Sequence, residues 1–156
     1  MDRTDVSLIA LRRILRATEL FGKELAQAAG LTPVQFRVLQ ITAETGSATP
    51  KGIATRMGVA QATVTVLVDK LVARGMVTRV RSETDRRQTN VVVTEAGRSA
   101  IQQAPDALQQ RYVRAFQKLE DWEQAQLISS LERVAGMLDA EGMDAAPVLD
   151  TGDFSS

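Results

Sequence analysis

The sequence predicts a mostly α-helical protein that carries one small β-hairpin, and three observations lead to this fold class. Apolar residues recur at spacings of three and four along several segments, which is the period of an amphipathic helix. Thr-Pro pairs and single glycines separate these segments where helices are expected to begin and end. Two short runs rich in β-branched residues, at 77–81 and 89–93, predict the two strands of the hairpin.

The first predicted helix covers about residues 5–29. Its apolar stripe consists of Leu8, Leu11, Leu15, Thr18, Phe21 and Leu25. Gly30 suits the end of this helix, because glycine readily adopts the left-handed backbone conformation that often follows a last helical turn.

The second predicted helix runs from Pro33 to about Glu44. Thr32 is its expected N-cap, the proline stands at the first helical position, and Gln35 completes a capping box. Residues 45–47, Thr-Gly-Ser, are expected to break the chain before the next helix.

Residues 49–75 predict a helix-turn-helix. Thr49 repeats the N-cap signal ahead of a short helix, Pro50–Met57, and a tight turn at Gly58 leads into a second helix that ends at about Arg74. In proteins that bind DNA through this motif, the second helix lies in the major groove, and its N-terminal residues meet the base edges.

The periodicity of this second helix turns Val64, Leu67, Val68 and Leu71 inward. The candidate base-contacting residues are Gln61, Ala62, Thr63, Thr65, Val66 and Lys70. A glutamine can form two hydrogen bonds with adenine, and the methyl groups of threonine and valine suit the methyl group of thymine. In the alternative interpretation, Thr63 and Thr65 are only surface residues of a structural helix.

The hairpin forms the wing of a winged helix-turn-helix, and its loop at 82–88 is expected to project into solvent. Arg86 and Arg87 lie at the tip, where arginines can contact phosphates and enter a narrow minor groove. Asp85 is expected to orient one of them through a charge-assisted pair. The alternative interpretation is a solvated charged turn.

Two further helices are predicted after the hairpin. Thr94 and Glu95 open the first, Pro105 predicts a kink or a restart within it, and the second begins at Asp121 or Trp122. The central lobe is too small to cover the apolar stripes of the first helix and of these two helices. We therefore expect an isologous homodimer, in which a second copy covers them.

These elements divide the 156-residue chain into four predicted parts. They are an N-terminal dimerisation helix (1–30), a DNA-binding winged helix-turn-helix (31–98), C-terminal dimerisation helices (99–141) and a flexible tail (142–156).

The formal net charge is zero, but residues 48–98 contain nine Lys or Arg against four Asp or Glu, whereas residues 99–156 contain four Lys or Arg against ten Asp or Glu. A basic central lobe is expected where a protein meets DNA phosphates.

The composition excludes several classes of function. The chain contains no cysteine and no histidine, which excludes disulfides, Cys/His metal sites, thiol-based redox sensing and histidine-dependent catalysis. The sequence shows no phosphate-binding glycine loop and no paired carboxylates, so we expect no enzyme, no catalytic residue, no metal and no cofactor. It also shows no leader peptide and no membrane-spanning stretch, so we expect a cytoplasmic protein without a membrane partner.

The stretch 52–97 resembles the DNA-binding core of the MarR family of bacterial regulators. The wing pattern of that family is an aspartate, any residue, an arginine, and then alternating aliphatic residues that end in threonine and, shortly after, glycine. Here the pattern is formed by Asp85, Arg87, Val91, Val93, Thr94 and Gly97. The resemblance covers roughly residues 31–100 at motif level, and the order of the flanking helices extends it to most of the chain.

The resemblance implies a homodimer, joined by its N- and C-terminal helices, that binds a pseudo-palindromic operator in double-stranded DNA. It also implies repression of nearby genes, relieved by a small phenolic or other aromatic ligand. It assigns base contacts to Gln61, Ala62, Thr63 and Thr65, wing contacts to Arg86 and Arg87, and the orienting role to Asp85. In two departures, Ala60 stands where many members have a serine N-cap, and Val66 stands where many have an arginine.

Arg12, Arg13 and Arg16 of the first helix are the candidate ligand contacts, because an arginine can pair with the carboxylate of an aromatic acid. The alternatives for these arginines are a solvated basic face and ion pairs between subunits. The alternative for the whole chain is a winged-helix module that binds another protein and has no ligand response. Whether DNA binding represses or activates a gene depends on where the operator lies in the promoter.

Overall fold

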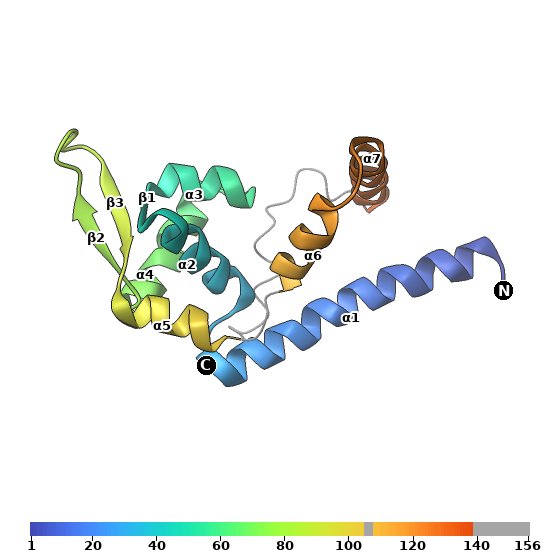
Figure 1. The fold of residues 1–156 in the computed structure, drawn as a ribbon, viewed down its shortest axis with the longest axis horizontal. Coiled ribbons are helices and arrows are strands. Elements are labelled where there is room, and N and C mark those ends of the chain that lie inside the picture. The colour runs from blue at the N-terminus through green and yellow to red at the C-terminus, as the bar shows by residue number, and fades with distance from the viewer. Residues whose placement is uncertain (105–107, 139–156) are drawn as a thin grey trace. The chain divides into compact units, whose positions relative to one another are not determined.

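The computed structural model describes residues 1–104 and 108–138, which belong to two compact units. The first unit contains α1 (Arg3–Ala29), α2 (Pro33–Thr45), β1 (Ser47–Ala48), α3 (Pro50–Met57), α4 (Gln61–Ala73), β2 (Val77–Arg81), β3 (Thr89–Val93) and α5 (Glu95–Gln103) (Figure 1). The second unit contains α6 (Leu108–Gln117) and α7 (Asp121–Met137). The predicted fold class, mostly helical with a winged helix-turn-helix, is confirmed.

The helices of the first unit begin at the predicted capping residues or close to them. The Thr32 hydroxyl accepts a hydrogen bond from the Gln35 N–H at 3.3 Å, and the Gln35 side chain accepts one from the Thr32 N–H at 3.1 Å, so the predicted capping box is present. Thr49 caps α3 by accepting a backbone N–H of the first turn at 3.0 Å. Helix α1 begins at Arg3, earlier than predicted, because Asp2 forms a capping box of its own.

The hairpin belongs to a three-stranded antiparallel sheet with the order β1-β3-β2. Strands β2 and β3 pair along all five residues of each, as the hairpin prediction requires. Strand β1 corrects the expectation that residues 45–47 only break the chain, since Ser47 pairs with Val92 and Ala48 with Val91. Two residues are too few to show an alternating pattern, and only the neighbouring edge of β3 makes them a strand.

The core of the first unit lies around α2, which packs against α4, α5, β1 and β3 and also contacts α1 and α3. The residues of α4 that were predicted to face inward are all buried, and they are Val64, Leu67, Val68 and Leu71. The buried residues of α1 are Phe21, Gly22 and Leu25. The C-terminal half of α1 therefore anchors this helix on the lobe.

The start of α5 explains part of the wing pattern. The Thr94 hydroxyl accepts the Gly97 N–H at 3.1 Å and donates to the Gly75 carbonyl at 2.6 Å. A Cβ atom on Gly97 would overlap the carbonyl oxygen of Met76. A threonine followed three residues later by glycine therefore lets α5 pack closely against the segment that leads into β2.

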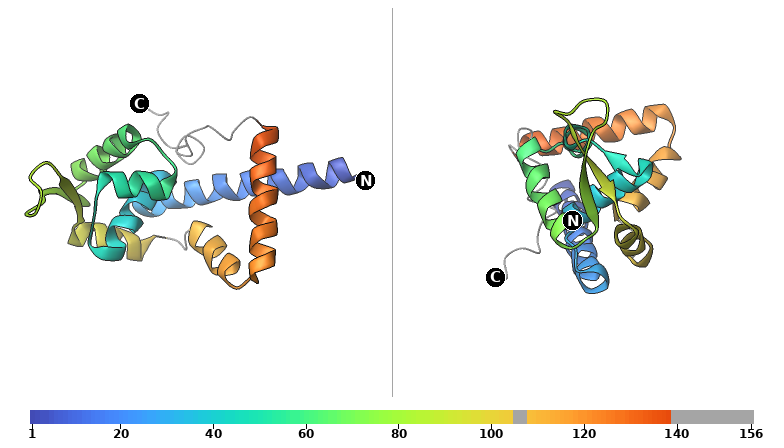
Figure 2. Two further views of the ribbon diagram at one scale, coloured as in Figure 1. Left: turned by 90° about the horizontal axis from the view of Figure 1, so that it is seen from above. Right: turned by 90° about the vertical axis from the view of Figure 1, so that its left-hand side faces the viewer.

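Large apolar side chains remain exposed on both units. In Figures 1 and 2 the hairpin projects from one end of the first unit, and the N-terminal part of α1 extends from the other. The exposed apolar residues of α1 include Val6, Leu8, Ile14, Leu15 and Leu20. In the second unit every residue of α7 is exposed or half-buried. Its exposed apolar residues include Trp122, Leu127, Ile128, Leu131, Val134 and Met137.

Pro105, where a kink or a restart was predicted, and the predicted flexible tail at 142–156 lie outside the described residues, and on either side of Pro105 the described helix α5 ends at Gln103 and α6 begins at Leu108. Among the residues that the structure does describe, no helix combines the length and the apolar character that crossing a membrane requires.

Candidate nucleic-acid interface

Helices α3 and α4 form the predicted helix-turn-helix. Gly58 ends α3 in the left-handed conformation, with φ of 68°, and the following Val59 N–H bonds back to the Ala54 carbonyl at 3.2 Å. The Ala60 carbonyl accepts the Thr63 N–H at 3.1 Å, and Ala60 as the N-cap residue has no side-chain hydroxyl to cap this helix start. The departure at Ala60 therefore means that α4 begins without the hydroxyl cap that a serine would provide.

The predicted base-contacting residues lie on the part of α4 that the core does not cover. The exposed ones are Gln61, Ala62, Thr65 and Val66, and the half-buried ones are Thr63 and Lys70. The side chain of Val66 is 53% exposed, which places an apolar surface where many members of the resembled family carry an arginine. The Thr65 hydroxyl donates to the Gln61 carbonyl at 3.2 Å, so this donor is used within the helix.

Arg79 of β2 joins the wing to α4. Its Nη2 atom lies 2.5 Å from Oδ1 of Asp69 and 3.5 Å from the carbonyl oxygen of Thr65, and both partners belong to α4. The guanidinium therefore holds β2 against the helix that carries the candidate base contacts. This role could not be read from the sequence, because only the fold brings β2 beside Asp69.

The wing loop is closed by its own polar contacts. The Ser82 N–H donates to the Gln88 carbonyl at 2.9 Å, and the Gln88 N–H donates to the Asp85 carbonyl at 3.0 Å. The Asp85 carboxylate accepts the backbone N–H of Arg87 at 3.0 Å, which forms an Asx turn. Asp85 thus shapes the backbone at Arg87; within the described part of the chain no ion pair joins Asp85 to a wing arginine, and the side chains of Arg86 and Arg87 are exposed.

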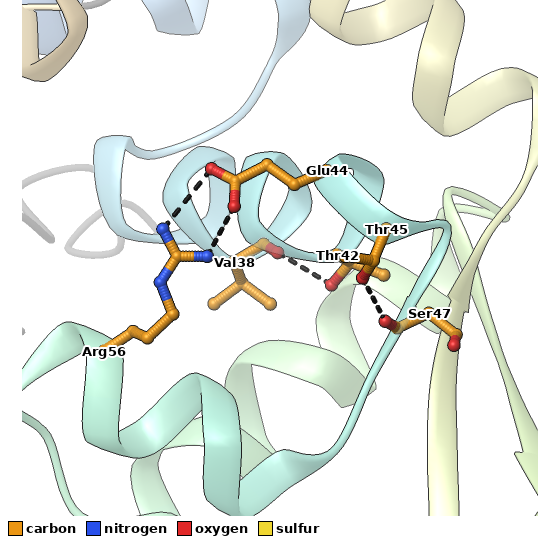
Figure 3. A network of polar contacts seen from close by, with 6 residues as sticks. All are labelled: Val38, Thr42, Glu44, Thr45, Ser47 and Arg56. Carbon is orange, nitrogen blue, oxygen red and sulfur yellow. Dashed lines mark hydrogen bonds and ion pairs between the residues drawn. The ribbon is translucent and has the colours of Figure 1, made fainter.

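A second ion pair holds α3 on α2 (Figure 3). Nη1 of Arg56 lies 2.5 Å from Oε2 of Glu44, and Nη2 lies 3.4 Å from Oε1. The hydrogen bond from Arg56 lowers the pKa of Glu44 below its ordinary value. The pKa of Arg37 is lowered mainly by its partial burial and, to a smaller extent, by repulsion from Arg56. At the end of α2 the Thr45 hydroxyl donates to the Ser47 carbonyl at 2.5 Å, so polar contacts connect α2 with both β1 and α3.

The predicted ligand-binding arginines lie on the exposed part of α1. Arg12, Arg13 and Arg16 are exposed, and Nη1 of Arg16 lies 3.5 Å from Oε2 of Glu19. A cavity of about 510 Å³ lies where α1 leads into α2. Its lining consists of Glu19, Gly22, Lys23, Ala26, Gly30, Leu31, Thr32 and Pro33. Of the described residues that line this cavity, none is Arg12, Arg13 or Arg16.

Another cavity, of about 610 Å³, lies between α2, β1 and α3 and also contacts Gln88, the last residue of the wing loop. Its lining includes Ile41, Thr49, Lys51, Arg56 and Gln88. None of these residues was predicted as a ligand contact from the sequence.

Comparisons with known proteins agree with this geometry. Residues 29–88 match the model of the MarR family. The HTH-type transcriptional regulator YcgE of Bacillus subtilis is 33% identical over 101 residues, which are 65% of this chain and 64% of that relative. The match thus spans slightly less than two thirds of the relative's own length.

Two solved structures are similar over most of the chain. A MepR-like protein, crystallised with pseudoligands, has a TM-score of 0.61 and 27% identity, and the match covers 88% of this chain and 97% of that protein. CouR from Rhodococcus jostii, bound to p-coumaroyl-CoA, has a TM-score of 0.60 and 26% identity, and the match covers 86% of this chain and 92% of CouR.

Proposed function

We propose that this chain is a MarR-family winged-helix transcriptional regulator rather than an enzyme, and that it acts as a homodimeric repressor that binds a pseudo-palindromic operator in double-stranded DNA. One observation carries this proposal. The contacts of Arg79 with Asp69 and Thr65 hold the wing against α4, so that the exposed face of α4 and the wing arginines belong to one lobe. The excess of basic residues in 48–98 supports binding to phosphates.

The two parts of this lobe would divide the work. The residues proposed to read bases are Gln61, Ala62, Thr63, Thr65, Val66 and Lys70 of α4. Small side chains at the start of α4 allow close approach to the floor of the major groove, and Gln61 can donate to and accept from one adenine. Arg86 and Arg87 would supply contacts to phosphates and the minor groove, with Asp85 shaping the turn that presents them.

A second copy of the chain would cover the exposed apolar side chains of α1 and of the second unit. Monomeric proteins seldom leave large contiguous apolar surfaces in water, and their removal from water favours association. An isologous pair through the N- and C-terminal helices would also place two copies of α4 on one duplex, which is the arrangement that a palindromic operator requires.

We further propose that a small aromatic or phenolic ligand releases the operator. The similar protein CouR is bound to p-coumaroyl-CoA, which supports an aromatic acid or its thioester as the ligand class. We propose that Arg12, Arg13 and Arg16 pair with the negative charge of the ligand. Their side chains are exposed on α1 and do not pack into the core of the lobe. The protein would act in the cytoplasm, where the DNA lies.

Selection from random duplex DNA tests the proposed function. The purified chain should enrich a pseudo-palindromic sequence whose half-sites are centred about 10 bp apart, because that is one helical turn. Binding should weaken steeply as salt rises, because phosphate contacts release counterions. Failure to enrich any sequence would overturn the proposal and leave the protein-interaction module.

A transcription assay on a promoter that contains the enriched sequence then separates repression from activation. A panel of benzoates, cinnamates and their CoA thioesters tests the ligand, with release of the labelled operator as the readout. No release by any member would contradict the aromatic ligand and leave a regulator that acts without one.

A further inference from the structure

The carboxyl end of α1 receives a guanidinium from another helix. Arg74, the C-cap residue of α4, donates from Nη1 to the Gly30 carbonyl and from Nη2 to the Ala29 carbonyl, the latter at 3.1 Å. The carbonyl groups of the last turn of a helix lack intrahelical partners, and this end of a helix carries partial negative charge. Arg74 therefore gives two carbonyl groups a hydrogen-bond donor and places its positive charge beside the partial negative charge of this helix end.

Helix α1 cannot provide this partner itself. All of α1 lies within the described residues, and its last turn, Ala-Gln-Ala-Ala, contains no basic side chain. Gly30 follows with φ of 66°, and a Cβ atom there would lie 2.9 Å from Nη2 of Arg74. A glycine at this position thus both permits the left-handed turn and leaves room for the guanidinium.

The Arg74 contact joins two helices that have few other connections. The buried residues of α1 are confined to Phe21, Gly22 and Leu25, and α1 packs against α2 and α5. The exposed N-terminal part of α1 extends away from the lobe (Figure 2). A small rotation of the lobe about the C-terminal end of α1 would therefore displace the far end of α1 strongly, and Arg74 opposes such a rotation.

We propose that Arg74 is a positioning residue for DNA binding, which fixes the angle between α4 and α1 and thereby the separation of the two recognition helices in the dimer. This inference rests on the proposed function, because it assumes a dimer joined partly through α1. Two linked sites gain affinity only when the linkage presents both at the correct spacing. A looser Arg74 contact should therefore weaken binding to two half-sites without affecting binding to one.

Arg74 is placed to act on geometry rather than on DNA directly. It lies at the opposite end of α4 from Gln61, which is about 20 Å away for a 13-residue helix at 1.5 Å per residue. Its guanidinium donates hydrogen bonds to the carbonyl groups of Ala29 and Gly30 at the end of α1. Loss of this side chain should therefore leave the salt dependence of half-site binding unchanged.

The first test compares Arg74→Ala and Arg74→Lys with the native chain on three DNA probes. The probes are the selected palindrome, the same duplex with one half-site scrambled, and palindromes whose spacer is one or two base pairs longer or shorter. Lys23→Ala is the control, because it removes a positive charge from an exposed site near the same end of α1. Thermal unfolding of every variant reports its stability.

For Arg74→Ala we expect a loss of about tenfold or more on the palindrome, unchanged affinity for the half-site and a flattened preference for spacer length. Arg74→Lys should restore much of the preference, since an ammonium group keeps the charge and can donate to both carbonyls. Lys23→Ala should behave as the native chain. Equal losses on both probes, or an unchanged spacer preference, would overturn the inference.

The second test needs no DNA. The chain contains no cysteine, so Ser7→Cys in α1 and Ala62→Cys in α4 allow specific spin labelling, with labelled subunits diluted in an excess of unlabelled ones. The native background should give one narrow distance distribution, and Arg74→Ala should broaden it or shift it by several ångströms. An unchanged distribution would overturn the inference even if the native chain binds its operator.

The two tests together separate this inference from the proposed function. If the native chain binds no DNA, the proposed function fails and the role of Arg74 in DNA binding fails with it, whatever the distance distribution. If the native chain selects a palindrome and Arg74→Ala keeps both its spacer preference and its distance distribution, only the inference about Arg74 fails.

Discussion

Arg79 of β2 lies 2.5 Å from the Asp69 carboxylate of α4, and this ion pair joins the wing to α4. The side chains are 36% and 60% exposed, so the pair is screened by water and contributes little to folding. We expect the ion pair instead to fix the position of the wing relative to α4.

Arg79→Ala should therefore reduce operator affinity much more than stability. The free energy of unfolding should fall by less than about 1 kcal/mol, as for exposed ion pairs generally. Operator affinity should fall several-fold because the wing loses its fixed position. The matched control is Arg81→Ala, which removes an exposed arginine from the same strand without breaking this pair. Equal losses of affinity for the two variants would show that only charge matters.

Arg87→Ala should weaken binding to the operator and to random DNA alike. Arg87 is exposed at the tip of the wing, where a phosphate contact carries no sequence information. The slope of log affinity against log salt should become shallower by about one unit, as expected for one lost phosphate contact. Unchanged affinity and an unchanged slope would remove the wing from the interface.

Gln61→Ala should instead relax the sequence preference. The residue is exposed at the N-terminal end of α4, where side chains reach base edges. Repeated selection with the variant should show lost preference at one or two base positions in each half-site. A uniform loss across all sequences, with the preference intact, would contradict base contact by this residue.

Replacing Gln40 by leucine should stabilise the fold. Gln40 is 5% exposed, and within the described part of the chain neither of its side-chain amide atoms has a hydrogen-bond partner. A buried unpaired amide costs about 1–3 kcal/mol, so Gln40→Leu should raise the unfolding temperature. Gln35→Leu is the control and should lower it, because this change destroys the capping box with Thr32. A lower unfolding temperature for Gln40→Leu would mean that the amide has a partner in solution.

The Glu44–Arg56 pair should make stability depend on pH in the acid range. Because Arg56 lowers the pKa of Glu44 in the folded state, the ionised carboxylate stabilises the fold above its unfolded-state pKa. That contribution is lost as the pH falls through the lowered pKa. The difference in unfolding free energy between the native chain and Glu44→Gln should therefore be present at neutral pH and vanish in acid. Glu24→Gln, at an exposed position of α1, is the matched control for the loss of a carboxylate.

Local features of the fold could be predicted from the sequence because their causes lie within a few residues. The capping box joins residues 32 and 35, and the inward face of α4 follows from a period of 3.6 residues. The strands of the hairpin are recognisable because each is a five-residue run rich in β-branched residues. The candidate base-contacting residues follow from the same periodicity, since the buried positions of α4 leave the others outside.

The contacts that position the candidate site required the tertiary structure. Strand β1 exists only because β3 lies beside it, and Arg79 contacts Asp69 only because β2 folds back along α4. The carbonyl groups of α1 lie 44 and 45 residues before Arg74 in the chain. No local pattern encodes such pairs, because an exposed arginine looks the same in sequence whether it contacts DNA, solvent or a distant helix. The sequence alone thus determined the winged helix-turn-helix and its exposed residues, whereas packing between distant segments decided which arginines are available to DNA and which hold the lobe together.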